Sequence, residues 1–543
     1  MFIYLREIAM FKRILGIILS VAMGISIVGT MNCVSARADE IPENQLTATT
    51  YATGGLGTLY GDIGFTALSL NGGGAYNSVT PLICGGKEYL FMPSNTDYSS
   101  MIFHFNDGVT LTAVNGKTEL PIVSDYPADI TKVLKKASAD GSQELTIRMN
   151  IGEAFFEYNL KIMKSANIAS MFITTDDPAK KGLYYVASNK DHKATGKATL
   201  INADNSIVYA GGLSQIKTRG NSTWISVKKP FQIKLAAATD LIETGNPLNA
   251  DKTWILLANA YDPTLIHNQV AYNMAQAMGL NAPDGRQVDL YFDGRYMGTY
   301  FLCEKVTTGA GRVPIDGKGY LLELDMAYFN QEENYFTDIT GTSFVIKEPE
   351  KVSEDNKKAI EYYMNEIMVA CANGGVSPTS GLKVSDMVDL DMLAKNYVFQ
   401  QTVKNPDAFV SSTYFYLPSG GKLIAGPMWD YDSAFGIKAE ANMTSTSGTC
   451  VFSDWMNAFL ALPEFQAAVK NAKRDMNKVA NNMSNSGISG YVNAITASEK
   501  MNRAVWCDYS LGMYIEKPTY AQNIATMKSF LRGRNSWVYS NIK

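Results

Sequence analysis

The chain has 543 residues, which at roughly 100–200 residues per domain suggests two to four domains. Apolar residues make up 46% and charged residues 18%, a globular balance that excludes general disorder, collagen and small disulfide scaffolds. The formal net charge is −4, so no global basic field draws the protein to nucleic acid or to an anionic membrane. The three histidines, His104, His192 and His267, stand far apart in sequence, which excludes closely spaced histidine clusters of the kind that most zinc enzymes use.

Residues 1–38 have the pattern of an export signal. Lys12 and Arg13 precede an apolar run of about 15 residues, and small residues ending in Ala36-x-Ala38 follow it. The run is shorter than the ~20 apolar residues of a bilayer span, and no later run reaches ~18. The sequence therefore predicts a secreted or cell-surface protein with no stable membrane span after signal cleavage. An uncleaved anchor is the alternative.

The segment that follows the signal, residues 39–165, is rich in strand patterns from residue 46 onward. Alternating apolar runs at 101–105 and 145–149 are separated by turn residues, for example at 106–108 and 115–116. This pattern predicts a small all-β, sandwich-like module.

A second unit begins near residue 170 and extends to residue 543. Residues 216–235 have the pattern of a strand, a polar glycine turn and a second strand. In the second strand Phe231, Ile233 and Leu235 share one face, because side chains alternate along a strand. The sequence also predicts a helix over 263–279, with Asp262 as its N-cap and a proline at its first position.

Strands precede helices in the remainder of this unit. Residues 288–302 read as a hairpin with an Asp-Gly turn, and residues 319–325 read as a further strand. Four helices are then predicted from apolar periodicity, at 354–372, 386–403, 455–482 and 519–541. This order predicts an α+β unit with two lobes.

Three acids in the second unit form the most informative pattern. Asp407 lies in a loop after a predicted helix, and Asp430 and Asp432 follow a short predicted hairpin. A hairpin between them allows the acids to converge. One carboxylate can then accept the proton of an acceptor hydroxyl, and another can hold a metal ion on nucleotide phosphates, as phosphoryl transfer requires. The alternative is that each acid caps a surface turn.

Four segments in this order strongly resemble motifs of the spore-coat protein H (CotH) kinase family. They are Arg-Gly-Asn-Ser-Thr-Trp at 219–224, Lys-Lys-Pro-Phe-x-x-Lys at 228–234, the glycine- and tyrosine-rich segment 293–304, and Trp-Asp-Tyr-Asp-x-x-Phe-Gly at 429–436. The resemblance covers roughly residues 170–543. It implies a divergent, two-lobed protein-kinase-like domain that uses ATP and Mg²⁺ or Mn²⁺ to phosphorylate secreted or cell-surface proteins.

The resemblance also assigns roles to the three acids. Asp407 matches the catalytic-loop aspartate and Asp430 the metal-binding aspartate, with Asp432 as a second candidate metal ligand. A protein kinase has an asparagine five residues after its catalytic aspartate, and this sequence has Ser412 there. A hydroxyl is a weaker metal ligand than an amide oxygen, so this departure puts full activity in doubt.

The resemblance places the nucleotide-binding cations in the first half of the unit. Lys234 is the candidate for the lysine that pairs with the phosphates, and Lys228 and Lys229 are its rivals. Arg219 and Asn221 are expected to face the nucleotide from the glycine turn.

Three further acids belong to this expectation. Glu304 follows a strand and matches the position of the kinase hinge that contacts the nucleotide. Glu323 and Asp325 either add negative charge near the cleft or are surface acids of a strand.

Two other functions stay open at the level of sequence. One is a pseudokinase, binding protein or surface-structural protein with the same fold, which Ser412 favours. The other is a glycosyltransferase, because Asp430 and Asp432 form a D-x-D pattern. The β-rich start and the absence of alternating strands and helices argue against this second alternative.

Overall fold

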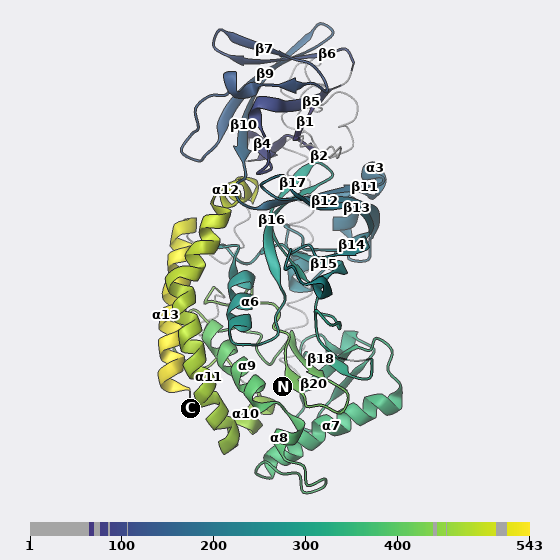
Figure 1. Ribbon diagram of the computed structural model, residues 1–543, viewed down its shortest axis with the longest axis vertical. Coiled ribbons are helices and arrows are strands. Elements are labelled where there is room, and N and C mark those ends of the chain that lie inside the picture. The colour runs from purple at the N-terminus through teal and green to yellow at the C-terminus, as the bar shows by residue number, and fades with distance from the viewer. Residues whose placement is uncertain are drawn as a thin grey trace, which may run out of the picture. The chain divides into compact units, whose positions relative to one another are not determined.

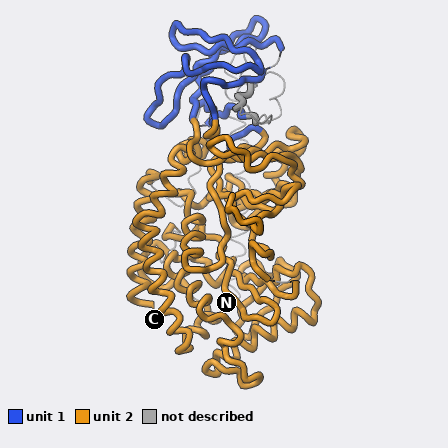
Figure 2. Tube along the Cα trace, in the orientation of Figure 1, with its two compact units in different colours: residues 1–92, 96–163, 294–296 blue, residues 93–95, 164–293, 297–543 orange. Residues whose placement is uncertain are grey.

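The structure is a computed structural model, and it describes residues 65–69, 77–84, 87–105, 107–315, 317–437, 443–451, 453–506 and 518–542. The predicted signal peptide lies outside these residues. The chain divides into two compact units, which Figure 2 distinguishes by colour. The first comprises residues 1–92, 96–163 and 294–296, and the second comprises residues 93–95, 164–293 and 297–543.

The described part of the first unit contains two β-sheets. One sheet has the order β2 (Asn77–Val79), β1 (Phe65–Ser69), β5 (Met101–Phe105) and β8 (Pro127–Ala128). The other has the order β3 (Leu82–Cys84), β4 (Lys87–Met92), β10 (Ala154–Lys164), β9 (Gln143–Ile151), β6 (Val109–Asn115) and β7 (Thr118–Ile122). The predicted strands at 101–105 and 145–149 are both present. Short 3-10 helices stand at Tyr98–Ser100 and Ile130–Lys132.

The second unit begins with a closed β-barrel (Figure 1). Its strand order is β11 (Ala169–Thr175), β12 (Ala194–Ile201), β13 (Ile207–Thr218), β14 (Phe231–Thr239), β15 (Asp251–Leu257), β17 (Arg295–Glu304) and β16 (Gly285–Phe292). Antiparallel pairs join β11 through β15 and then β17. The barrel closes because β16 pairs in parallel with β11, with Ala169 opposite Val288.

Alternation along the strands fills the barrel interior. Phe231, Ile233 and Leu235 are fully buried, whereas Gln232 is half-buried and Lys234 is exposed on the outer wall. The interior also holds several large side chains from neighbouring strands, including Trp254, Leu256, Leu290, Phe292 and Tyr300. Small connecting helices lie at α3 (Pro178–Lys181), α4 (Leu183–Ser188) and α5 (Ser222–Ile225).

The predicted hairpin at 288–302 corresponds to β16 and β17. Its turn residues Asp293 and Gly294 have φ of 48° and 80°, the left-handed pair that a two-residue hairpin turn requires. The Asp293 carboxylate accepts hydrogen bonds from the Thr175 N–H at 2.8 Å and the Leu183 N–H at 3.0 Å. The side chain therefore ties this turn to the neighbouring strand β11.

A second sheet and a set of helices complete the unit. The sheet order is β19 (Tyr335–Thr337), β20 (Ser343–Glu348), β18 (Tyr320–Leu324), β21 (Thr413–Leu417) and β22 (Ile424–Ala425). The longer helices are α6 (His267–Ala277), α7 (Glu354–Ala372), α9 (Leu390–Val403), α11 (Pro463–Asn482), α12 (Ile488–Trp506) and α13 (Tyr520–Asn541), with short α8 (Val384–Met387) and α10 (Asp454–Leu460). One hydrophobic core joins this sheet, these helices and the outer side of β15 and β17.

The helix predictions hold best where the periodicity is strong. The predicted helix 354–372 is α7, and 519–541 is α13 with one residue less at its start. The predicted helix 386–403 is interrupted between α8 and α9, because the Asp389 side chain accepts the Met392 N–H and starts a new helix. Pro463 likewise separates α10 from α11 within the predicted helix 455–482.

Two of the helices, α6 and α12, differ from the sequence expectation. Helix α6 begins at His267, four residues after the predicted start at 263. Helix α12 was not expected from the sequence. The structure is nevertheless of mixed α+β type, as predicted. Within the described part of the chain, no helix has the length and apolar character that a bilayer span needs.

The barrel interior supports a prediction about stability. Phe231 is fully buried, and its ring packs against Phe292 and Tyr300 at centroid distances of 5.5 Å and 6.2 Å. Phe231→Ala is expected to lower the free energy of unfolding by about 3–5 kcal/mol, measured by urea denaturation. The matched control, Ile225→Ala, removes a side chain that is 44% exposed and should cost less than about 0.5 kcal/mol. Equal losses in the two variants would contradict the packing described.

Candidate active site

Asp407 lies in the loop between α9 and β21. Its N–H donates to the Asn405 side-chain oxygen at 3.1 Å, and its carbonyl accepts from the Val410 and Ser411 N–H groups at 2.9 Å and 3.0 Å. The Ser411 hydroxyl donates to Asp325 Oδ1 at 3.1 Å. These bonds fix the loop to the end of β18, so the position of Asp407 is set by its own turn and by a buried acid.

The segment that carries Asp430 and Asp432 is held by the residue between them. Tyr431 is fully buried. Its N–H donates to the Asn268 side-chain oxygen of α6 at 2.9 Å, and its hydroxyl accepts from Gln400 Nε2 of α9 at 2.9 Å. Two helices thereby position Tyr431, and the acids on either side of it follow.

The three predicted acids converge. The Asp430 and Asp432 side chains are hydrogen-bonded to each other. Burial raises the pKa of Asp432 well above its usual range, and the negative charges of Asp430, Asp262 and Asp407 raise it further. Burial also raises the pKa of Asp430, against the lowering effect of Arg219. We call Asp262, Asp407, Asp430 and Asp432 the acid cluster.

Asp262 is a member of the acid cluster that the sequence did not assign to the site. It was expected to cap a helix that starts at residue 263. Instead its carboxylate accepts from the Thr264 N–H at 2.7 Å and, five residues on, from the His267 N–H at 2.7 Å. It therefore caps both the intervening turn and α6. The Asp-Pro dipeptide was the available signal, but it gave no indication of the tertiary contact.

His267 connects Asp262 to the segment of Asp432. Its ring is fully buried, with Nε2 3.4 Å from Asp262 Oδ1 and Nδ1 3.3 Å from the Asp432 carbonyl oxygen. Burial lowers the pKa of His267 and outweighs the opposite effect of Asp262. The ring also packs against Phe435 at 5.0 Å. Its contacts suit a positioning role.

Ser412 lies beside Asp430. Its side chain hydrogen-bonds to the Asp430 carboxylate and lowers that group's pKa, although burial dominates. The hydroxyl at the position of the kinase asparagine therefore does reach the acid cluster.

Arg219 is the cation that the structure brings to this cluster. Its guanidinium stacks over the Trp429 ring at 5.2 Å and lowers the pKa of Asp430. Tyr261 connects the backbone of the same turn to the acid cluster. Its hydroxyl donates to the Ser222 carbonyl oxygen at 2.9 Å. Burial raises the pKa of Tyr261, and the charges of Asp432 and Asp430 raise it further, so both acids lie near this hydroxyl. The glycine turn thus lies next to the acids.

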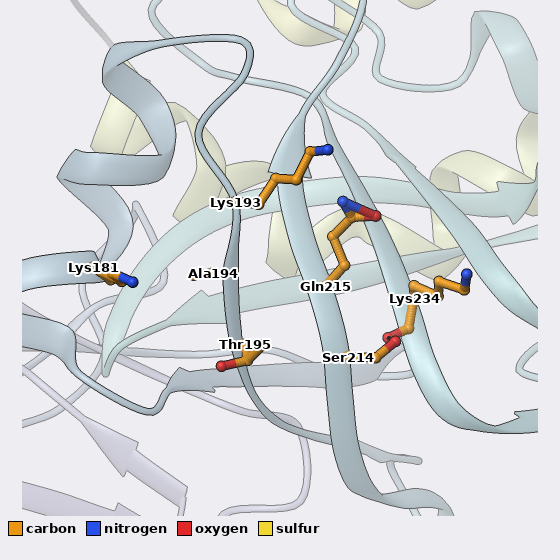
Figure 3. A pocket seen from close by; sticks show the side chains of 7 residues that line it. All are labelled: Lys181, Lys193, Ala194, Thr195, Ser214, Gln215 and Lys234. Carbon is orange, nitrogen blue, oxygen red and sulfur yellow. Dashed lines mark hydrogen bonds between the residues drawn. The ribbon is translucent and has the colours of Figure 1, made fainter.

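The side chains of Asn221 and Lys234 make no contact with the acid cluster that the structure describes. The Asn221 side chain is exposed and accepts a hydrogen bond from Lys190 Nζ at 2.8 Å. Lys234 is exposed on the outer wall of the barrel, where it lines a pocket with Lys181, Lys193 and other polar residues (Figure 3). The structure therefore does not place the Lys234 side chain among the groups that act on Asp430.

The two rival lysines are fixed inside the protein. Lys228 Nζ donates to the Thr299 carbonyl at 2.6 Å and to Asn502 Oδ1 at 2.9 Å. Lys229 Nζ donates to the Trp224 carbonyl and lies 4.5 Å from the centre of the Trp224 ring. Both ammonium groups are used to hold neighbouring segments together.

Glu304 is also bound within the protein. Its side chain forms an ion pair with Arg312 Nη1, and its Oε2 accepts from the Asp284 N–H at 3.0 Å. Arg312 in turn stacks over the Trp254 ring at 4.9 Å. The carboxylate of Glu304 therefore stabilises the end of β17, and any contact of this segment with a nucleotide would fall to its backbone.

Glu323 and Asp325 are not surface acids, so that alternative from the sequence is wrong. Both side chains are buried. Glu323 forms an ion pair with Lys347 at 3.4 Å and hydrogen-bonds to Tyr414, and Asp325 holds the loop of Asp407 as described above. Their part is to support the site from the strand β18.

Left-handed backbone conformations gather in the two segments that carry the acids. The non-glycine residues Lys404, Phe409, Ser412, Asp430 and Phe435 have φ of 52°, 56°, 51°, 69° and 58°. Such conformations cost free energy, so surrounding contacts have to enforce them, and they concentrate at functional sites. No sequence pattern indicates them, because none of the five is a glycine.

The acid cluster fits a divalent cation of the magnesium type. Among the residues that the structure describes, no group of three or more histidine, cysteine or acidic side chains has the geometry to hold a metal ion. Magnesium, however, is commonly bound by one or two carboxylates together with water and substrate phosphates. Asp430 and Asp432 supply two neighbouring carboxyl groups, and Ser412 supplies a hydroxyl oxygen beside Asp430. These three side chains would hold the cation.

Residues 216–538 match the family described as CotH kinase protein, over more than half of the chain. The chain therefore belongs to the CotH kinase family. The resemblance noted from the sequence motifs is confirmed. The comparison with curated proteins gave no match.

Two solved structures show a distant similarity to this chain. The proinflammatory kinase CtkA of Helicobacter pylori is 10% identical, with a TM-score of 0.27 over 57% of this chain and 93% of that chain. A chain of the HipA, HipB and operator DNA complex of Shewanella oneidensis MR-1 is 14% identical, with a TM-score of 0.26 over 54% of this chain and 62% of that chain.

The environment of Lys228 supports a prediction about pH. Burial lowers the pKa of Lys228 to about 7, against the ordinary 10.5. Between these values the unfolded chain binds the proton that the folded chain has released, so this lysine's contribution to the free energy of unfolding rises with pH. We expect the advantage of the wild type over Lys228→Met to grow from pH 7 to pH 10 in chemical denaturation.

The matched control is Lys197→Met, which changes an exposed lysine of the same barrel. Its effect on the free energy of unfolding should be small, below about 0.5 kcal/mol, because the side chain is exposed. A Lys228→Met difference that does not change between pH 7 and pH 10 would mean that Lys228 remains protonated in the folded protein.

Proposed function

We propose that this protein is an exported kinase that transfers the γ-phosphate of ATP to hydroxyl side chains of secreted or cell-surface proteins. The convergence of Asp407, Asp430 and Asp432 beside Arg219 is the observation that carries the proposal. Membership of the CotH kinase family supports it independently. Export rests on the signal-peptide pattern of residues 1–38.

The proposal gives each part of the second unit a role. The barrel acts as the nucleotide-binding lobe, and the second sheet with its helices acts as the catalytic lobe. The glycine turn that bears Arg219 contributes from the first lobe, and Asp407, Asp430 and Asp432 contribute from the second. This division corresponds to the two lobes of a protein kinase, in which catalysis depends mainly on positioning and charge stabilisation.

Asp407 is proposed to act on the acceptor. Its carboxylate orients the acceptor hydroxyl and takes the proton as the oxygen attacks phosphorus, while ADP departs with the electrons of the broken bond. The hydrogen bonds within its loop hold the backbone of Asp407 in one place, which lowers the entropic cost of positioning its side chain.

Asp430 and Asp432 are proposed to hold the divalent cation, with Ser412 alongside. When bound, Mg²⁺ or Mn²⁺ neutralises charge on the nucleotide phosphates. Arg219, stacked on Trp429, supplies a further positive charge at a fixed position. An arginine is suited to this task because its guanidinium stays charged and can form two parallel hydrogen bonds with phosphate oxygens.

Asp430→Asn should abolish metal-dependent nucleotide binding. The amide removes the negative charge that offsets the cation's charge, while it keeps the size of the side chain. Isothermal titration calorimetry of ATP binding, with and without Mg²⁺, measures the change in affinity. Unchanged magnesium dependence of ATP binding in this variant would show that another residue holds the metal.

Asp407→Asn should fail in a different way. Since Asp407 is proposed to contact the acceptor, the variant should keep its ATP affinity but lose about 10²–10⁴-fold in transfer rate, as expected for the loss of a general base. The loss should appear in kcat more than in the KM for ATP. Equal transfer by the variant and the wild type would show that the role is misassigned.

A pseudokinase or binding protein with this fold is the second candidate function. The observation in its favour is Ser412, whose hydroxyl occupies the place beside Asp430 where a kinase has an asparagine. Wild-type protein that binds ATP and Mg²⁺ but transfers phosphate to no exported protein would establish this alternative. A phosphoproteomic comparison of secreted proteins from cells with and without the protein is the broadest test.

A further inference from the structure

A polar pocket of about 380 Å³ opens on the outer wall of the barrel (Figure 3). Its lining combines three lysines with hydroxyl and amide groups: Lys181, Lys193, Ala194, Thr195, Ser214, Gln215 and Lys234. They come from the end of α3, from the start of β12 and from the neighbouring strands β13 and β14. The lining contains neither an acid nor an aromatic ring, so the pocket suits an anion rather than a nucleotide base.

Positive charge continues from this pocket towards the acid cluster. Lys217 follows Gln215 by two residues on β13, so the two side chains share a face of the strand. Burial lowers the pKa of Lys217, and the charges of Lys193, Lys305 and Arg219 lower it further. Lys193 at the pocket and Arg219 at the acid cluster thus both act on Lys217. Lys193 lies beside β13, because Ala194 pairs with Ile216, and Arg219 follows the last residue of β13. We call Lys193, Lys217 and Arg219 the basic band.

Two acids lie beside this band and moderate its charge. The charge of Asp191 raises the pKa of Lys217, whereas the neighbouring lysines lower it. The Thr195 hydroxyl donates to Asp176 Oδ2 at 2.5 Å, which places that carboxylate near the pocket. Three lysines line the pocket, so the pocket itself carries more positive charge than these two acids offset.

We propose that the pocket docks an anionic side chain, a carboxylate or a phosphate, of the protein substrate whose hydroxyl is phosphorylated at the acid cluster. This inference rests on the proposed function. Gln215 and Arg219 are four residues apart on the chain, or about 13 Å at roughly 3.3 Å per residue. An extended substrate would span that length with about four residues. The preferred substrate would therefore carry an anionic residue about four positions from the acceptor.

The test measures peptide binding to the full mature chain by fluorescence anisotropy, without ATP. Three labelled peptides share one sequence with a serine acceptor and carry glutamate, phosphoserine or glutamine four positions away, each made with the variable residue before and after the acceptor. The glutamate or phosphoserine peptide should bind more tightly than the glutamine peptide, and the difference should shrink at high salt. The two anionic peptides distinguish a carboxylate from a phosphate as the natural ligand.

The double variant Lys181→Gln/Lys193→Gln should weaken binding of the anionic peptides by about two- to tenfold, as expected for two partly solvated ion pairs. Binding of the glutamine peptide should not change. Lys197→Gln, an exposed lysine of β12 that does not line the pocket, is the control and should change nothing. Equal binding of all peptides to the wild type, or equal effects of the two variants, would overturn the proposal.

The binding assay separates this inference from the proposed kinase activity. Selective peptide binding without phosphate transfer would support the docking pocket and count against the enzyme. Transfer that is indifferent to the anionic residue, with unselective binding, would leave the enzyme and remove the pocket. If the double variant weakens ATP binding instead, the pocket belongs to the nucleotide site and the docking proposal is wrong.

Discussion

The candidate site depends on how Tyr431 is held between two helices. Asn268 of α6 accepts its N–H, and Gln400 of α9 donates to its hydroxyl. The Tyr431 side chain is fully buried, so water cannot replace these hydrogen bonds. Losing either bond would leave a buried polar group without a partner, which costs free energy of folding. Because Asp430 and Asp432 are the chain neighbours of Tyr431, their separation and direction are set by this one residue. The left-handed conformation of Asp430 is a consequence, since the chain has to turn sharply to satisfy both helices.

Concentrating four carboxylates in this place has an energetic consequence for the folded protein. Burial disfavours ionisation of both Asp430 and Asp432, and the charge of Asp430 adds to this effect on Asp432. Arg219 compensates only partly, and the remaining cost has to be met by packing elsewhere in the unit.

The sequence was most informative where a pattern is local. Apolar periodicity placed α7 at its observed bounds, and alternation placed Phe231, Ile233 and Leu235 inside. Barrel closure was not predictable in this way, because it requires Ala169 to pair with Val288, far along the chain.

Family motifs indicated which acids converge. The family resemblance assigned Lys234 to the nucleotide phosphates, and the structure shows that residue exposed on the outer wall of the barrel, where it lines the polar pocket. The buried contacts of His267 and Asp262 arise from tertiary packing and leave no pattern in sequence.

The closed barrel also limits how this protein associates with other chains. An open sheet exposes a row of unpaired N–H and C=O groups on its outermost strand, and an extended segment of another molecule can pair with that row. Here the pairing of β16 with β11 uses up both outermost strands of the barrel. Strand addition, the commonest way for a sheet to capture an extended polypeptide and also a route to aggregation, is therefore closed to the barrel. Recognition on its wall has to rely on side chains, which makes specificity there depend on charge and shape rather than on backbone hydrogen bonds.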